Sequence, residues 1–226
     1  PSPSTTIGAK ADEAEDLSTP LTLEATTDGT TVTFTLDASV VTNAVEYRVN
    51  DNSWATYTSG VGIELDAGDK VQFRGENATY ATDEDNYSNI SCDQDCYVYG
   101  NIMSLISPTD FATCTELEVK YTFCGLFMGN TCIMNHEMKE LLLPATTLKR
   151  HCYYFMFREC SNLTETTALP ATKLEDRCYE YMFYGCEKLT EAPVLPATTL
   201  VKNCYKAMFK KCSSLNHVTY YATDLS

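Results

Sequence analysis

The sequence predicts a mixed α/β protein in which an antiparallel β-sandwich precedes a solenoid of short repeats. Two observations predict it. Short alternating segments rich in Thr, Val, Tyr and Phe fill the first part of the chain, and one sequence frame returns every 26 residues in the last part. We therefore expect three regions: a flexible tether at residues 1–20, a β-sandwich at 21–95 and a solenoid at 96–226.

The tether and the charge distribution come first along the chain. Residues 1–20 are rich in Pro, Ser, Thr and acidic residues, a composition typical of flexible segments. The net charge of the chain is −15, and residues 1–143 hold 6 Lys and Arg against 23 Asp and Glu. Because such an acidic surface repels phosphate backbones, the sequence disfavours nucleic acid as a partner. It is compatible with a solubilising face or with recruitment of a basic partner.

The β-sandwich is predicted from six alternating segments separated by good turn sequences such as "TDGT" and "DAGD". An immunoglobulin-like arrangement is plausible, although the single Trp and the absence of early cysteines give no antibody-type signature. The segments are "LTLEAT", "TVTFTL", "AVEYRV", "SWATYT", "GIELD" and "KVQFRG".

The repeats begin at Pro144, Pro170 and Pro196, and each contains a frame such as "CYEYMFYGC". A degenerate earlier unit starts near residue 121. One unit is too short to bury a core alone, so neighbouring units must stack. The spacing of four between Cys152, Met156 and Cys160 favours a short helical turn. The following "LTEAPVL" fits a strand with Leu189, Ala192 and Val194 facing inward. This pattern predicts a leucine-rich-repeat-like solenoid.

The repeat frame, with Cys-x-x-Leu after a Met-Phe pair and then "LPATTL", resembles the BspA-like leucine-rich repeats of bacterial cell-surface proteins. The resemblance covers residues 122–226, and it departs from the common form in its 26-residue period and in the cysteines at 152, 178 and 204. It implies export and display on the cell surface, often as a lipoprotein, through a lipid anchor outside this chain. It does not imply one activity, since members are described as adhesins or have no known function.

The eleven cysteines are compatible with several states. Buried thiols are favoured over disulfides for the repeat cysteines, and zinc is disfavoured because an x7 gap is wrong for a Cys pair. Cys92 and Cys96 are candidates for a local disulfide, with free thiols, a clamp or a weak metal site as alternatives. Free-thiol titration would separate a third option, a thiol-dependent or metal-dependent structural protein. We expect no metal and no cofactor.

No catalytic residue can be named, because no hydrolase, metalloprotease or phosphate-loop motif occurs. The sequence therefore favours a non-enzymatic, extracellular binding or adhesion protein on a bacterial surface that engages a host or matrix protein or a glycan. A polysaccharide-acting enzyme or an enzyme accessory module is the alternative. Solenoids often bind ligands on the strand face. There the candidate binding residues are Glu165, Thr167, Glu191, Pro193, His217 and Thr219.

The last repeat is followed by "VTYYATDLS" without a visible capping repeat. An uncapped stack exposes apolar surface and an unpaired edge. Tyr220 and Tyr221 are therefore candidates for a self-association surface, and a homodimer through this end is a candidate assembly. The alternative is that the natural protein continues past this point, as members of the resembled family often do.

Overall fold

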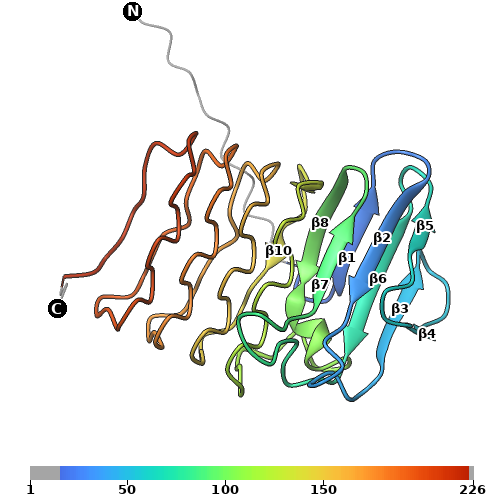
Figure 1. Cartoon of the computed structure of the whole chain (residues 1–226), viewed down its shortest axis with the longest axis horizontal. Coiled ribbons are helices and arrows are strands. Elements are labelled where there is room, and N and C mark those ends of the chain that lie inside the picture. Colours follow the sequence, from blue (N-terminus) through green and yellow to red (C-terminus); the bar gives the residue numbers. More distant parts are fainter. Residues whose placement is uncertain (1–15, 224–226) are drawn as a thin grey trace, which may run out of the picture.

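A computed structural model (Figure 1) describes residues 16–223 and is almost entirely β. Residues 1–15 of the expected tether lie outside the described part. Within it there is no α-helix, and η1 is a single short 3-10 helix. The elements are β1 Leu21–Ala25, β2 Thr30–Thr35, β3 Val45–Val49, β4 Ala55–Thr56, β5 Ile63–Leu65, β6 Lys70–Gly75, β7 Asn89–Cys92, β8 Cys96–Asn101, η1 Ile102–Leu105, β9 Ile133–Asn135 and β10 Leu141–Leu142.

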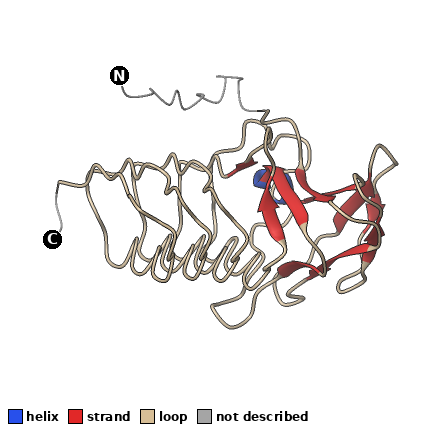
Figure 2. Ribbon diagram, turned by 90° about the horizontal axis from the view of Figure 1, so that it is seen from above, coloured by secondary structure: helices blue, strands red, loops and turns tan. Residues whose placement is uncertain are grey.

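The predicted mixed α/β class with a leucine-rich-repeat solenoid is wrong. The three repeats contain neither the helical turn nor the strand that such a repeat requires, and their residues are turns and irregular chain (Figure 2). The described strands instead belong to two sheets, in the order β10-β8-β1-β6-β3-β4, with β9 also paired to β8, and β5-β2-β7. The molecule is therefore a β protein with a stack of turns at one end.

Strands β1 to β6 correspond to the six segments predicted from their alternation. In β6 every second residue is buried, which places Val71 and Phe73 in the core. The ring of Phe73 meets Phe34 of β2 edge-on, with centroids 5.4 Å apart, so the two sheets pack face to face. Most pairs are antiparallel, but β9 and β10 pair with β8 in parallel.

The sheets and the repeats share one hydrophobic core. Strand β8 pairs with β1 on one side and with β9 and β10 on the other, and β9 and β10 lead directly into the first repeat. The Ile90 N–H of β7 donates to the Leu126 carbonyl over 2.7 Å, which ties the second sheet to the turns. The stack is thus built on the sheets rather than tethered beside them.

Four turn segments, residues 121–130, 151–160, 177–186 and 203–212, form one long side of the stack. In each segment a residue with positive φ recurs at every fourth position, as at His151, Phe155 and Glu159. Along each of the first three segments, consecutive backbone amides donate alternately to a carbonyl of the same segment and to a carbonyl of the next one. The Tyr154 N–H donates to the His151 carbonyl within its own segment, whereas the Tyr153 N–H donates to the Cys178 carbonyl of the next one.

This alternation explains why the predicted helical turn is absent. A spacing of four apolar residues satisfies an α-helix, but it also satisfies consecutive four-residue turns. A left-handed residue in every turn prevents the continuous i to i−4 bonding that a helix needs. In its place, half of the amides of the first three segments bond to the next segment, so that stacking supplies the hydrogen bonds a helix would satisfy internally.

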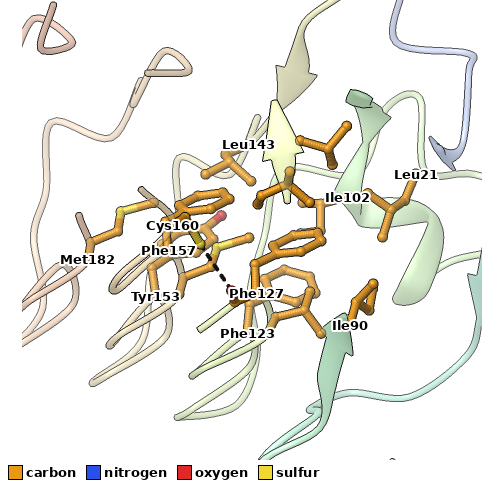
Figure 3. Close-up of a cluster of buried hydrophobic side chains, with 14 of the residues drawn as sticks. Leu21, Ile90, Ile102, Phe123, Phe127, Leu143, Tyr153, Phe157, Cys160 and Met182 are labelled. Atoms are coloured by element: carbon orange, nitrogen blue, oxygen red, sulfur yellow. Dashed lines mark hydrogen bonds between the residues drawn. The ribbon is translucent and has the colours of Figure 1, made fainter. Parts of the chain in front are cut away.

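Equivalent side chains lie on one another along the stack. Phe157 stacks on Phe127 at 5.5 Å and on Phe183 at 5.3 Å, with the rings within 5° of parallel. Tyr153 stacks on Tyr179 at 5.6 Å. The close-up in Figure 3 shows Phe127, Tyr153 and Phe157 in one cluster with sheet residues such as Leu21 and Ile90. The dashed line marks the Cys160 thiol, which donates to the Phe127 carbonyl over 3.0 Å.

The register expected for "LTEAPVL" is also wrong. Residues 189–194 form no strand, Pro193 is buried, and Val194 is 47% exposed. Prolines at 193 and 196 cannot donate the hydrogen bonds a strand ladder needs, so an irregular path is favoured here. Leu189 faces inward and Glu191 outward as expected, whereas Pro193 and Val194 have exchanged the sides expected for them.

Candidate functional site

A surface hollow lies where the chain between β9 and β10 meets the irregular sides of the first two repeats. Its rim carries four carboxylates, at Glu137, Glu140, Glu165 and Glu191. Ala192, Pro193 and Val194 add an apolar wall. A smaller depression lined by His136, Lys139 and Leu141 continues from it and shares Glu140, Glu165 and Thr167.

The structure brings four of the six candidate binding residues together in this hollow. Glu165 and Glu191 are exposed on its rim, while Thr167 and Pro193 are buried in its wall. His217 and Thr219 lie elsewhere, in the third repeat, where the His217 Nε2 and Thr219 Oγ1 atoms are 3.0 Å apart. The four therefore meet because of the way the irregular sides fold and not because of a strand face.

Thr167 is the unusual member of the hollow. The residue is 9% exposed, and its hydroxyl has no hydrogen-bond partner within the described part of the chain. A buried hydroxyl left unpaired costs about 1–3 kcal/mol. The hydroxyl oxygen has almost no exposed surface, so it lies behind the wall of the hollow and not on its surface.

Two basic side chains, Lys139 and His136, lie in the smaller depression next to the hollow. The Lys139 ammonium lies 3.3 Å from Glu24 and 4.4 Å from the Tyr99 ring centroid, so its charge is engaged by β1 and β8. Burial and the nearby charge of Lys139 lower the pKa of His136, which keeps that imidazole neutral at pH 7. Among the described residues that line the hollow, four are glutamates and none is Lys or Arg, and we call it the acidic hollow.

Glu137 and Glu140 were not found from the sequence. They lie between β9 and β10, in a stretch that does not share the 26-residue frame, and no spacing marks them. The one available signal was the excess of acid in residues 1–143, which points to an acidic surface without placing it.

The cysteines divide into two groups. Cys92 and Cys96 are joined by a disulfide at the junction of β7 and β8, and the other nine carry free thiols. Six of the free thiols are the repeat cysteines, and all six are buried. Burial raises the pKa of Cys152 to about 12 and that of Cys212 to about 11, so these thiols are protonated at neutral pH.

The second cysteine of each repeat has a defined partner. The thiols of Cys160, Cys186 and Cys212 donate to the Phe127, Phe157 and Phe183 carbonyls over 3.0, 3.1 and 3.0 Å. Residues 16–223 contain no group of three or more His, Cys, Asp or Glu side chains arranged to hold a metal ion. The repeat cysteines thus serve as packing residues that also link adjacent turn segments.

Tyr220 and Tyr221 are 60% and 56% exposed. Tyr220 forms an isolated parallel bridge with Leu195, so the chain after the last turn segment lies along the second repeat. Both rings are available to a partner, as the self-association hypothesis requires.

No family model, curated protein or solved structure matches this chain. The resemblance to BspA-like proteins therefore stays a prediction made on the repeat frame. None of the described helices is long or apolar enough to span a bilayer.

Proposed function

We propose that this protein is a non-catalytic binding protein whose acidic hollow holds a positively charged segment of a partner protein. The observation that carries the proposal is the grouping of Glu137, Glu140, Glu165 and Glu191 around one hollow that also has an apolar wall. Carboxylates at the rim pair with ammonium or guanidinium groups of a ligand.

The apolar wall fits the same ligand class. Lys and Arg side chains bury their aliphatic stems against apolar surface while the charged head stays at the rim. Pro193 and Val194 supply that surface directly beside Glu191. A basic peptide therefore matches both parts of the hollow, whereas a neutral glycan offers no cationic group to the carboxylates.

Extracellular display on a bacterial surface is part of the proposal. It is supported by the resemblance of the repeats to BspA-like surface proteins and by the Cys92–Cys96 disulfide, which suits an oxidising compartment. The buried repeat thiols are compatible with such a compartment because oxidants and metals do not reach them.

The test uses a fluorescein-labelled nonalysine peptide and fluorescence anisotropy at low salt, with a nonaglutamate peptide as the negative probe. We expect binding that weakens as salt rises. The double variant E165Q/E191Q should bind at least tenfold more weakly. The matched variant E64Q/E118Q removes two exposed carboxylates elsewhere and should stay within twofold.

Equal loss in both double variants would mean that only the net charge matters and would contradict a site in the hollow. Binding of an uncharged oligosaccharide that survives E165Q/E191Q would contradict the basic-peptide class. Release of reducing sugar from a polysaccharide by the wild-type protein would contradict the non-catalytic role.

A further inference from the structure

The turn segments stack with a fixed direction. In each of the first three segments the amides of the odd-numbered residues donate to the carbonyls of even-numbered residues in, or immediately before, the following segment. Tyr179 donates to Cys204, Tyr181 to Lys206, and Phe183 to Met208, over 3.0 Å each. Every segment therefore presents acceptors toward the sheets and donors toward the C-terminal end.

The last segment, residues 203–212, ends this ladder with donors alone. Its even-numbered amides bond within the segment, as when the Met208 N–H donates to the Tyr205 carbonyl. The odd-numbered amides, from Asn203 to Lys211, have no acceptor among residues 16–223. The outer edge of the stack is thus a row of N–H groups with no carbonyl between them.

The side chains of this edge are incompletely covered. Tyr179 and Phe183 are 1% exposed because the next segment stacks on them, but the equivalent Tyr205 and Phe209 are half-buried. Tyr205 stacks on Tyr179 at 5.7 Å and Phe209 on Phe183 at 5.8 Å, each on one face. The outer ring faces are placed to stack on one further aromatic pair.

The edge is also basic, unlike the rest of the molecule. Residues 197–215 contain four lysines and no Asp or Glu, in a chain whose net charge is −15. Lys206 is held 2.8 Å from buried Glu180, and Lys211 lies over the Tyr184 ring. Lys202 and Lys210 are exposed beside the donor row.

We propose that this edge docks an acidic polypeptide segment of a partner protein, which adds to the stack through a row of main-chain carbonyls. Addition of a chain to an open hydrogen-bonding edge is a common recognition mode, in which the main chain gives affinity and side-chain pockets give specificity. Here the lysines select negative charge and the Tyr205 and Phe209 rings select an aromatic pair.

The direction of the ladder argues against a second copy of this chain as the occupant. A symmetric dimer through this edge would place N–H groups against N–H groups. Head-to-tail stacking would need the free carbonyls of a first turn segment, but the Thr122 and Leu126 carbonyls already accept from Tyr80 and Ile90. The direction of the ladder therefore favours a different polypeptide over a second copy of this chain as the occupant.

The probe is a fluorescein-labelled synthetic peptide of residues 170–195 with its two cysteines replaced by alanine. It carries five acidic and three basic residues, and in the folded protein its segment supplies the carbonyls that accept from the first repeat. A scrambled peptide of the same composition is the control. We expect anisotropy to report binding of the repeat peptide and little binding of the scrambled one.

Two pairs of variants make the test specific. K202E/K210E should weaken binding at least tenfold, while K173E/K188E, with the same charge change on exposed lysines of the second repeat, should stay within twofold.

Phe209→Pro removes an outward N–H together with the ring, and Phe209→Ala removes the ring alone. The Pro variant should therefore bind the peptide at least threefold more weakly than the Ala variant. Circular dichroism and urea midpoints verify that each variant folds.

Equal binding by Phe209→Pro and Phe209→Ala would overturn the donor ladder as the docking element. Equal binding of the scrambled peptide would reduce the site to non-specific charge attraction and would also overturn it. A concentration-dependent dimer with cross-links between the Lys210 residues of two copies would overturn the choice of occupant.

Discussion

The two-sheet region and the turn stack both satisfy their backbone hydrogen bonds between neighbouring segments, but they do so with different backbone conformations. In both, backbone N–H and C=O groups pair between neighbouring chain segments and large aromatic side chains fill the interior. The sheets do so with extended strands whose side chains alternate. The stack does so with four-residue turns in which a left-handed residue recurs at every fourth position. Regular pairing between segments therefore does not require regular secondary structure within them.

The comparison has its largest consequence at the stacked phenylalanines. Phe157 is 2% exposed and is covered by rings on both faces, while Phe209 is covered on one face. Phe157→Ala should lower the free energy of unfolding by about 3–5 kcal/mol, a typical cost for a buried phenylalanine, and Phe209→Ala by less than half of that. Urea denaturation followed by circular dichroism measures both. Similar losses in the two variants would contradict an open end to the stack.

Substitutions between glycine and alanine at positions of positive φ distinguish a stack of turns from helices by their effect on stability. Gly185 has a φ of 75°, and a Cβ atom there would lie 3.2 Å from the Glu159 Cγ, so Gly185→Ala should destabilise the protein by about 1–2 kcal/mol. Ala207 has a φ of 52° at the equivalent kind of position. Ala207→Gly should be neutral or stabilising by up to about 1 kcal/mol.

In a helix the same Ala207→Gly change would cost about 1 kcal/mol, because glycine is the poorer helix former. The sign of its effect on the urea midpoint therefore separates the two local structures. A clear destabilisation by Ala207→Gly would contradict the left-handed turn.

A smaller, pH-dependent effect is expected at His151. Burial, together with the charges of Arg150 and Arg177, lowers the pKa of His151 from 6.5 to about 4. Between pH 4 and pH 6.5 the imidazole of His151 is protonated in the unfolded chain but not in the folded chain. The free energy of unfolding therefore decreases as the pH falls from 6.5 to 4.

The matched variant is His151→Asn, because Asn203 occupies the equivalent left-handed position in the third repeat. Its stability should decline less than that of the wild type over this pH range. Urea midpoints at pH 7.5, 6.5, 5.5 and 4.5 test this, and parallel declines would rule out His151 as a contributor.

The sequence predicted the sheets better than the repeats for a physical reason. Alternation at a period of two is specific to extended strands, so β2 and β6 were placed from residues such as Phe34 and Phe73 alone. A spacing of four is shared by helices and successive turns, and nothing in Cys152, Met156 and Cys160 distinguishes them. The backbone conformation that decides is carried by residues such as Phe155, whose side chain gives no sign of a positive φ.

The candidate site was predicted in part. Glu165 and Glu191 were found because the 26-residue frame places them at equivalent positions. Thr167 and Pro193 were named on a strand register that the structure does not have, and they enter the hollow because the irregular chain turns them inward. Glu137 and Glu140 could not be found, since only the path of β9 and β10 along β8 brings them beside the repeats.

Amide hydrogen exchange resolved by residue tests the directional ladder of turns most directly. The account predicts strong protection at Tyr179, Tyr181 and Phe183, whose amides donate to the next segment, and rapid exchange at Tyr205, Ala207 and Phe209, which have the same positions at the open edge. Equal protection of the two sets, or the protection of every consecutive amide from 203 to 212 that a helix would give, would contradict it.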